Sequence, residues 1–534
     1  MAMHSVRYST TLIFLSVISF SICFSDLPLS QVYYITASPS DNCFTEPCLT
    51  LSECAKNSSK YLHSNTALIF LPGNHTLEEE VMAMDISKIV LYSINYSDST
   101  SMDVRVICKQ LGRFIFHNIV SIHILGLEFV GCINQYLAVS LVTLKGATFI
   151  GVNSSQTAVD LENSSATIVK SNFYHNSLGR YLHDYRVGGA IISTGSNLTI
   201  TESQFIGNSA ELGGAVYLQN NSNVTIANST FVVNHATCLR EGRVCYGSVL
   251  CSHASTIEIC CSMFQHNSAI GNSKREVSHG GVLAAFHGRI SICDSIFIAN
   301  RAEGAGGVIT AYSAALRVDL CEFSNNTAIR GGTIYTEKTY VISTWNRFIH
   351  NTATLKGGVL YSVEGFVADA GSNFSRNKAV SGGVVFAQHT NITFTRCKIR
   401  LNTASGWFGG VVQSKQGKLT FTGSNVSENT AEVSGGVAEV NAANVDIRDS
   451  KFEKNTAKNY YGGVINTQES NVVISGSSFI NNAASKNGGV INLENSNMTT
   501  SVSRFINNTG SHGGAVAFYD EQQVAKLPSK CVNF

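Results

Sequence analysis

The chain has few charged residues and few prolines. Of its 534 residues only 14% are Asp, Glu, Lys or Arg, 5 are Pro and 2 are Trp. The net charge of +1 provides no overall electrostatic attraction for nucleic acid or an anionic membrane, so we expect no nucleic-acid partner. Because 44% of the residues are hydrophobic, the composition excludes disorder. The chain is therefore expected to fold.

Long apolar runs are also missing, with one exception at the start. A short polar segment with His4 and Arg7 precedes an apolar run from Thr11 to Phe24. This run is too short for a membrane span, and no later stretch reaches the roughly 18 apolar residues that a span needs. We interpret residues 1–25 as a signal peptide cleaved near Ser25, with an uncleaved anchor as the alternative. The mature chain is expected to be secreted or extracellular, in association with a cell surface or free, without a transmembrane span.

Secretion determines how the cysteines are interpreted. Of the 15 cysteines, Cys23 leaves with the signal peptide, and an even number remains. No pair has zinc-site spacing, so we expect no metal and no other cofactor. Disulfides are expected in an oxidising compartment. The chain also contains many N-x-S/T sequons, which predict a glycoprotein; they include those at Asn57, Asn74, Asn197, Asn223, Asn391 and Asn497.

A repeat of about 26 residues dominates the sequence. The tetrapeptide F-x-x-N recurs, and a Gly-Gly pair follows most copies, at a spacing of 25 to 27 residues from Gly281 onward. The copies of F-x-x-N begin at Phe173, Phe205, Phe231, Phe264, Phe297, Phe323, Phe348, Phe374, Phe452, Phe479 and Phe505, with weakened copies at Ile399 and Val426. Regular periods of this length are typical of stacked solenoids.

Short alternating runs lie between these marks and predict strands. Pairs such as Leu198/Ile200 and Ile257/Ile259 stand seven and five residues before the Phe, and alternation with period two indicates a strand with one buried face. One coil cannot bury its apolar face alone, so the copies must stack. We predict an all-β, right-handed, single-stranded parallel β-helix with a buried Phe column. The Asn is expected to bond to the next coil at a turn, and the Gly pair to form a bend.

The remaining segments complete this organisation. Residues 26–80 are expected to hold an N-terminal cap and the first strand, with a short capping helix around Cys48–Leu62 and a capping box formed by Thr50 and Glu53. Residues 81–170 look like degenerate coils, 171–518 are the regular repeats and 519–534 are a C-terminal tail. The tail either closes the rod or belongs to a longer product.

Two family resemblances follow from these motifs. The F-x-x-N motif paired with GGAI at Gly188 and GGAV at Gly213 and Gly513 resembles the repeats of chlamydial polymorphic outer-membrane proteins. The opening YYITASPSDNCFTEPCLTLSECA with LIFLPGNHTL is similar to the start of pectin-lyase-like β-helix proteins. The first resemblance implies an adhesive surface role, and the second implies polysaccharide cleavage on acidic residues. Nothing here resembles the membrane barrel that ends the chlamydial proteins.

Acidic residues and cysteines supply the candidate sites. Asp294 and Asp319 stand near the Phe on consecutive coils and are weak candidates for catalysis, with solvated surface carboxylates as the alternative. For disulfides we expect Cys260 with Cys293, which stand four residues before their Phe on neighbouring coils. We also expect Cys238 with Cys245, which flank an insertion, and Cys108 with Cys132, which are nearly one coil apart.

Three functions remain open at this point. The first is a non-enzymatic secreted or cell-surface adhesion protein, a rigid glycosylated rod whose partner is an extracellular protein or glycan. Insertions at 178–187, 236–248 and 271–279 are its expected binding elements. The second is a polysaccharide lyase or glycoside hydrolase of pectin-lyase type. The third is a structural spacer in a longer surface protein.

Overall fold

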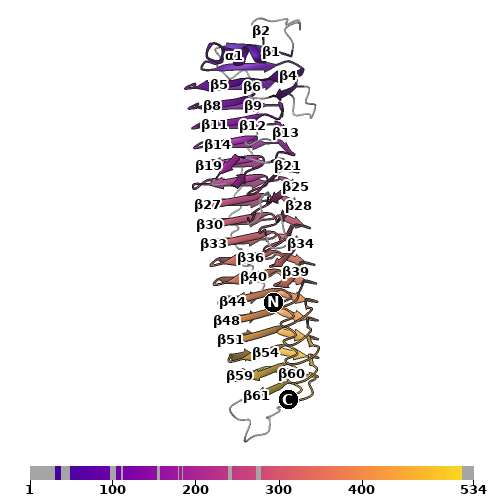
Figure 1. Cartoon of the computed structure of the whole chain (residues 1–534). Helices are drawn as coiled ribbons and strands as arrows, with labels where there is room; N and C mark the ends of the chain where they lie inside the picture. Colours follow the sequence, from indigo (N-terminus) through magenta and orange to yellow (C-terminus); the bar gives the residue numbers. More distant parts are fainter. Residues whose placement is uncertain are drawn as a thin grey trace, which may run out of the picture.

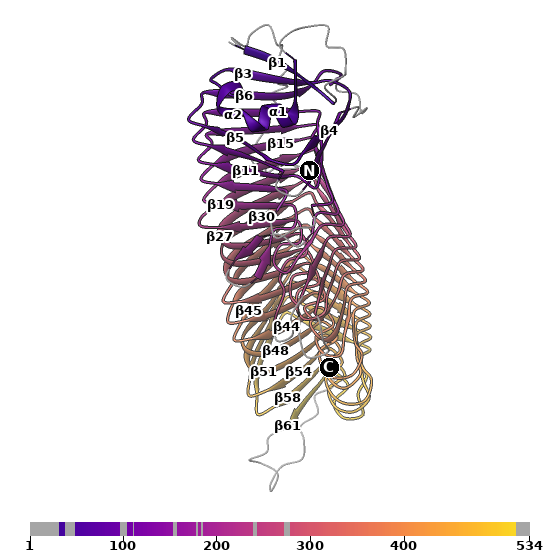
Figure 2. The ribbon, with the colours of Figure 1, turned by 45° about the horizontal axis from the view of Figure 1, so that its top comes forward.

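The chain folds into a rod of stacked parallel β-coils (Figure 1). The computed structural model describes residues 31–37, 48–96, 104–109, 112–152, 157–177, 180–182, 185–238, 243–271 and 278–519. The signal-peptide interpretation and most of the C-terminal tail concern residues outside this part. The coils follow one another in sequence order along the rod (Figures 1 and 2). The structure is 61% strand and 2% helix, which confirms the all-β parallel β-helix.

Each regular coil contains four strand segments. The strand after the Gly pair is named here the front strand, the next the side strand, the one with the repeat Phe the Phe strand, and the last the short strand. In one coil, the 11-residue β30 (Leu283–Cys293) provides both the front and the side strand, β31 (Ile296–Ile298) is the Phe strand and β32 (Arg301–Ala302) is the short strand. Every segment pairs in parallel with its counterpart in the next coil, as in Cys260 with Cys293 and Phe264 with Phe297.

The remaining elements have the following bounds. Front and side strands form one large sheet. Five 11-residue strands serve as both: β27(Leu250–Cys260), β30, β33(Ile309–Asp319), β48(Val412–Thr422) and β51(Ala438–Arg448). The other front strands are β5(Glu80–Met84), β8(Arg113–His117), β11(Ile133–Leu137), β14(Val159–Glu162), β19(Ile191–Thr194), β23(Val216–Gln219), β36(Ile334–Glu337), β40(Leu360–Val363), β44(Val385–Gln388), β54(Ile465–Gln468), β58(Ile491–Glu494) and β61(Val516–Tyr519). The other side strands are β1(Gln31–Thr36), β3(Thr66–Phe70), β6(Lys88–Ser93), β9(Ser121–Leu125), β12(Leu141–Lys145), β15(Ser165–Val169), β20(Asn197–Thr201), β24(Asn223–Ala227), β37(Tyr340–Thr344), β41(Phe366–Ala370), β45(Asn391–Thr395), β55(Asn471–Ser475) and β59(Asn497–Ser501), and β2(Cys48–Thr50) pairs with β1.

The Phe strands and short strands form two further sheets. The Phe strands are β4(Gly73–Leu77), β7(Val104–Cys108), β10(Glu128–Val130), β13(Thr148–Ile150), β16(Asn172–Tyr174), β21(Gln204–Ile206), β25(Thr230–Val232), β28(Met263–Gln265), β31, β34(Glu322–Ser324), β38(Arg347–Ile349), β42(Asn373–Ser375), β46(Lys398–Arg400), β49(Asn425–Ser427), β52(Lys451–Glu453), β56(Ser478–Ile480) and β60(Arg504–Ile506). The short strands are β22(Ser209–Ala210), β26(His235–Thr237), β29(Ser268–Ile270), β32, β35(Thr327–Arg330), β39(Thr352–Lys356), β43(Lys378–Ala379), β47(Thr403–Ala404), β50(Thr430–Ala431), β53(Thr456–Ala457) and β57(Ala483–Ala484).

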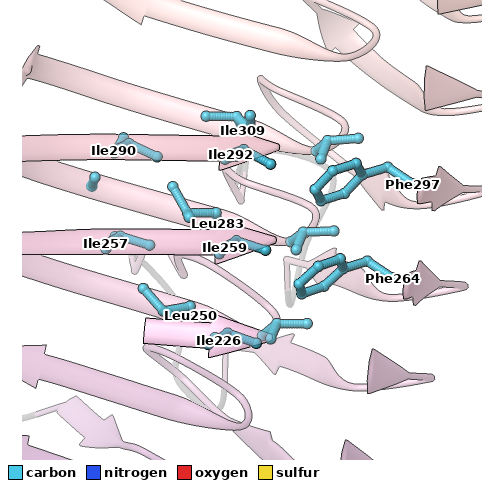
Figure 3. Packing of buried hydrophobic residues seen from close by; sticks show 14 of the residues in the cluster. Ile226, Leu250, Ile257, Ile259, Phe264, Leu283, Ile290, Ile292, Phe297 and Ile309 are labelled. Atoms are coloured by element: carbon cyan, nitrogen blue, oxygen red, sulfur yellow. The ribbon is translucent and has the colours of Figure 1, made fainter. Parts of the chain in front are cut away.

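The repeat phenylalanines form a continuous column inside the rod. Phe264 lies 4.9 Å from Phe231 and 4.8 Å from Phe297, measured between ring centroids, with nearly parallel rings. Figure 3 shows Phe264 and Phe297 beside the aliphatic side chains of the neighbouring strands, among them Ile257 and Ile290. These side chains are at most 1% exposed. The predicted Phe column is therefore present, and each of its rings is buried together with the aliphatic side chains of the same coil.

The aromatic rings of the column come from the side strands in the coils where the repeat Phe is replaced. In the coils with Ile399 and Val426, the side strands contribute Phe394 and Phe421 to the core instead. Phe374 meets Phe394 edge to face at 5.6 Å, and Phe394 stacks on Phe421 at 5.3 Å. The lost ring volume on one strand is replaced on the next, because a packed core tolerates no large void.

The repeat asparagines form a buried ladder at the turn after the Phe strand. The Asn234 amide donates to the carbonyl of Phe205 at 2.9 Å and to Oδ1 of Asn267 at 3.0 Å. The bond to the next coil predicted for the Asn is therefore present. The residue before it adopts a positive φ, as in Val233 with φ of 55°, and this leaves the Asn side chain directed inward for the ladder.

The two glycines of a pair serve different purposes. Gly306 has φ of +64°, which an L side chain rarely adopts. Gly307 needs no such angle, but a Cβ there would lie 2.1 Å from the carbonyl oxygen of Gly332 in the next coil. The first glycine allows the bend and the second allows the close approach of two coils.

The N-terminal end carries the capping helix. Helix α1(Leu51–Lys56) begins after Thr50, whose side chain accepts from the Glu53 backbone while Glu53 caps the Thr50 backbone, so the capping box is present. Leu51, Cys54 and Ala55 are buried on its inner side, and a second short helix, α2(Ser58–Tyr61), follows. Strands of residues 81–170 pair in the same register as the regular coils. Among the described residues, no helix is long and apolar enough to cross a membrane.

Candidate functional site

The outer side of the front strands carries the most unusual residues of the rod. In β27, Leu250 and Ser252 face the main core, while Cys251 is buried in a separate small apolar cluster with Tyr217 and Ala284, and His253 is exposed. The second and fourth positions of each front strand therefore face away from the core, because side chains alternate along a strand. These two positions form two columns along the rod.

Six aromatic rings on these columns form a line that we name the aromatic stripe: His253, Phe286, Tyr312, Tyr335, Tyr361 and Phe386. Their successive centroid separations are 4.7, 5.1, 5.9, 5.3 and 4.9 Å. Five consecutive steps without a gap make this a continuous line of rings over six coils. His253 is exposed, Phe286, Tyr312 and Tyr335 are partly exposed, and Tyr361 and Phe386 are buried, at 8 and 1% exposure.

The stripe crosses from one column to the other. His253, Phe286 and Tyr312 occupy fourth positions, and the second positions of their strands hold small residues: Cys251, Ala284 and Thr310. From Tyr335 onward the ring occupies the second position. The crossing coincides with the tilted pair Tyr312–Tyr335, whose rings are 56° apart. In the first three strands of the stripe, the small residues at the second positions therefore leave room for the rings at the fourth positions. The line of rings stays continuous when it passes to the second positions.

The residue before each Gly pair lies over the front strand of the next coil. Lys356 places its Nζ 4.2 Å from the ring centroid of Phe386, and Arg330 places its Cζ 5.9 Å from that of Tyr361. Tyr246 meets Phe286 edge to face at 4.9 Å and stacks on His279. This column forms one side of the stripe, and its cations contact the aromatic rings directly.

Three cations, Arg330, Lys356 and Lys415, lie beside the C-terminal half of the stripe. Burial lowers the pKa of Lys356, and the nearby charges of Lys415 and Arg330 lower it further. The ion pairs found among the described residues include none of these three. Burial also raises the pKa of Tyr335 to about 12, with Glu337 adding to the effect. The stripe thus combines protonated phenols with positive charge that an anionic group could neutralise.

In the coils that follow the stripe toward the C-terminus, the second positions of the front strands are polar. These positions hold Gln413, Glu439, Asn466 and Asn492. The Asn466 amide donates to Glu439 Oε1 at 3.0 Å, and the Asn492 amide donates to Asn466 Oδ1 at 2.8 Å. Three acceptor atoms in this line are buried without a hydrogen-bond partner, namely Gln413 Oε1, Glu439 Oε2 and Asn492 Oδ1. Unpaired buried acceptors are costly, and these three atoms are closed to solvent.

Glu439 is an acid of the front strands whose pKa is strongly shifted. Burial raises its pKa to about 8, against the opposing hydrogen bond from Asn466, and the charge of Glu494 adds to the rise. The residue as a whole is partly exposed, although its Oε2 is not. Near neutral pH much of this carboxyl is protonated, so it can donate as well as accept.

An apolar ridge, named here the corner ridge, runs beside the loops that lead to the front strands. Leu355, Trp407 and Tyr460 are 46, 56 and 40% exposed. Val380 and Val433 stand between them, and backbone hydrogen bonds join the series, such as that from Trp407 N to Val380 O at 2.8 Å. Exposed aromatic and aliphatic side chains on consecutive coils are characteristic of contact surfaces.

All three insertions leave the rod at this same corner, at the N-terminal end of the stripe. The first contains the hairpin of β17(Arg180–Leu182) and β18(Tyr185–Val187), and Cys238 and Cys245 close the second. Arg243 of the second stands over the ring of Tyr185 in the first, 4.5 Å from its centroid. Residues 178–179, 183–184, 239–242 and 272–277 lie outside the described part.

The two acidic candidates from the sequence lie on another face. Asp294 is exposed in the turn after the side strand, and its N–H donates to the Asp319 carbonyl oxygen at 3.1 Å. The Asp319 carboxylate accepts from Arg317 at 2.5 Å and from the Thr344 hydroxyl. The structure brings the two residues together on neighbouring coils, but it does not place them on the front strands with the stripe and Glu439.

The cysteine pairs proposed from spacing all have disulfide geometry. The Cα atoms are 5.0 Å apart for Cys108 and Cys132, 5.5 Å for Cys238 and Cys245, and 4.6 Å for Cys260 and Cys293. Free cysteines in the described part are Cys54, Cys251, Cys261, Cys321 and Cys397. The chain can therefore bond neighbouring coils and close one of the insertions.

The sequons avoid the front of the rod. Asn197, Asn223, Asn391 and Asn497 all begin side strands and are exposed, and Asn57 and Asn74 are exposed near the cap. Within the described part of residues 157–519, every sequon lies on a side strand, a Phe strand or the turns around them: Asn163, Asn197, Asn220, Asn223, Asn228, Asn325, Asn373, Asn391, Asn425, Asn497 and Asn507. The front strands, short strands and connecting loops of that part carry none.

Sequence reasoning missed the stripe, Glu439 and the corner ridge. Aligning the chain on its Gly pairs provides the missing signal, because Phe286 and Tyr312 stand five residues after the second Gly and Tyr335, Tyr361 and Phe386 stand three after it. Comparison of the chain with known proteins yields neither a matching family model nor a matching curated protein.

Proposed function

We propose that the chain is a non-enzymatic extracellular interaction protein that binds an elongated acidic glycan along its front strands. The observation that carries this proposal is the aromatic stripe, a line of rings on six consecutive coils of which the first four are exposed or partly exposed. Tyrosine and arginine are the residues that most often dominate binding surfaces, because they combine apolar area with hydrogen-bonding groups. A rigid rod presents such a line without a large entropy cost on binding.

The charges beside the stripe favour an acidic ligand. Arg330, Lys356 and Lys415 act together on one short stretch, and carboxylate or sulfate groups are their natural partners. Successive rings of the stripe are separated by a distance comparable to one sugar ring in an extended chain.

Secretion, glycosylation and the finer family resemblances support the same reading. A signal-like start, many sequons and disulfide-capable cysteines fit an extracellular protein. Glycans on the side and Phe strands would cover the rest of the surface and leave the front strands open. The resemblances to chlamydial surface proteins and to pectin-lyase-like proteins fit an adhesive rod and a carbohydrate ligand, respectively.

The test is a binding assay with matched charge variants. The secreted chain is applied to immobilised polyuronate, sulfated polysaccharide and neutral glucan. We expect binding to the acidic polymers that falls at least tenfold in Arg330→Ala/Lys356→Ala/Lys415→Ala. The control, Lys398→Ala/Arg400→Ala/Arg504→Ala, removes the same charge from exposed Phe-strand positions and should bind normally. Equal loss in both variants, or equally strong binding to the neutral glucan, would overturn the proposal.

An enzyme of pectin-lyase type is the second candidate, and Glu439 is the observation that favours it. A buried carboxyl with a raised pKa is typical of a general acid in glycoside cleavage. The same three polymers, with and without Ca²⁺, are scored for new reducing or unsaturated ends. Turnover that disappears in Glu439→Gln but persists in Asp294→Ala/Asp319→Ala would establish an enzyme at the front strands. Absence of turnover in folded protein leaves the interaction role.

A further inference from the structure

Three cysteine sulfurs meet where β27 and β30 end. Cys260 and Cys293 are equivalent positions on the two strands and form an inter-coil disulfide with Cα atoms 4.6 Å apart. Cys261 follows in the turn as a free, exposed cysteine. Its Sγ lies 3.6 Å from Sγ of Cys260. A free thiol therefore stands in contact with a disulfide sulfur.

The other free thiols of the described part are not equivalent to Cys261. Cys54, Cys251, Cys321 and Cys397 are all buried. Burial raises the pKa of Cys54 and of Cys321 to about 12 and raises that of Cys251 and Cys397 as well. Because the thiolate is the nucleophile, these four are poorly reactive. Cys261 is the free cysteine in this part that solvent reaches.

We propose that Cys260, Cys261 and Cys293 form a thiol–disulfide exchange site. The Cys261 thiolate attacks Sγ of Cys260, so that a bond between Cys260 and Cys261 forms as the bond between Cys260 and Cys293 breaks. Cys293 leaves as a thiolate and takes up a proton from water, which replaces the proton that Cys261 released. The count of disulfides is unchanged, so the step needs no external oxidant or reductant, and its reverse restores the inter-coil bond.

The bond that exchanges joins two coils of functional interest. β27 and β30 carry His253 and Phe286, the first two rings of the stripe. The insertions at 236–248 and 271–279 lead directly into these strands. Opening the Cys260–Cys293 bond removes the covalent tie between these coils while the parallel hydrogen bonds of the sheet remain. The exchange site therefore controls how firmly the N-terminal end of the stripe is held.

Alkylation mapping tests this site. The secreted, non-reduced chain is incubated at pH 8 with N-ethylmaleimide, quenched in acid, digested without reduction and analysed by mass spectrometry. We expect two products: Cys261 alkylated with Cys260 bonded to Cys293, and Cys293 alkylated with Cys260 bonded to Cys261. The second product should increase with incubation time, because alkylation traps each Cys293 thiolate that forms.

The Cys261→Ser variant is the control. Asn228 and Asp294 occupy the same turn position in the adjacent coils with similar positive φ, so a small polar residue fits there. Alkylated Cys293 should disappear in this variant, and Cys108 and Cys132 should remain unlabelled in both proteins. Two results would overturn the proposal: Cys293 never labelled in the native chain, or Cys293 labelled equally in Cys261→Ser, which would mean that the disulfide is merely incomplete.

Discussion

The backbone N–H and the side-chain amide of Asn234 both donate to one atom, Oδ1 of Asn267 in the next coil, at 2.9 and 3.0 Å. The same relationship recurs from coil to coil, for example between Asn351 and Asn377. The Oδ1 of each ladder residue thus accepts hydrogen bonds from a backbone N–H and a side-chain amide at a turn, where strand pairing provides no acceptor. The ladder fixes the spacing of neighbouring coils at the turn beside the Phe column.

Removing one member of the ladder should be costly. In Asn267→Ala the N–H and the amide of Asn234 lose their acceptor inside the rod, and each unsatisfied donor costs about 1–3 kcal/mol. We expect the unfolding midpoint in urea to fall clearly. Asn471→Ala removes an exposed asparagine whose amide donates to Asn444 at 3.3 Å and should change stability by less than about 0.5 kcal/mol. Equal effects in the two variants would contradict the role of the buried ladder.

The second glycine of a pair should tolerate no side chain. A Cβ at Gly307 would overlap the Gly332 carbonyl at 2.1 Å, so Gly307→Ala must push two coils apart. We expect a destabilisation above about 3 kcal/mol or failure to be secreted. Gly423 has a positive φ, unlike Gly307, and the nearest atom to its Cβ position is 3.4 Å away. Gly423→Asn should therefore be secreted at a near-normal level, and a similar loss in both variants would show that the close approach of two coils at Gly307 is not what excludes a side chain there.

Two buried acids should make the rod less stable as the pH rises. Burial raises the pKa of Asp369 to about 6 and that of Glu439 to about 8. An acid with a raised pKa in the folded state stabilises it below the unfolded value and loses this contribution as the pH rises through the folded value. The melting temperature should therefore fall between about pH 4 and 8.

Two variants separate these contributions. Glu439→Gln should remove the part of the decline that extends to about pH 8, and Asp369→Asn should remove only the part below about pH 6. The measurement is thermal unfolding followed by circular dichroism from pH 4 to 9. A decline of unchanged slope in both variants would show that other groups cause it.

Much of the fold could be predicted from the sequence, because the residues that set it repeat at a fixed spacing. The Phe column, the Gly bends and the Thr50–Glu53 capping box are local signals that tertiary packing did not overrule. Phe129 and Phe149 extend the same column, but the F-x-x-N pattern does not reveal them because no Asn follows them. The pattern does not reveal Phe394 either, because this residue fills the core from another strand.

The functional face could not be predicted in the same way. Its rings change from the fourth to the second strand position between Tyr312 and Tyr335, so no single spacing reveals them. The burial of Glu439 depends on what lies over its strand, and the contact of Cys261 with a disulfide depends on how two coils stack. Such relationships exist only between coils. Acidic residues on consecutive coils therefore point to Asp294 and Asp319, which lie on another face.

Glycan mapping should reproduce the asymmetry of the sequons. In chain secreted from a glycosylating cell, peptide mass spectrometry should find occupied sites at exposed side-strand positions such as Asn197, Asn223, Asn391 and Asn497. Occupancy at these sites would leave the front strands uncovered. If none of them carries a glycan, glycans do not cover the side strands, and only the cations beside the stripe favour an acidic ligand at the front strands.

The most direct test of the account places a glycan on the stripe itself. Glu337→Asn creates a sequon with Thr339 beside Tyr335, and Glu322→Asn creates one with Ser324 on a Phe strand, like the natural sequon at Asn373. Both variants are secreted, mapped for glycan occupancy and applied to immobilised polyuronate. The account predicts that the occupied Glu337→Asn chain loses binding while the Glu322→Asn chain keeps it. Native-level binding by a fully occupied Glu337→Asn chain would contradict it.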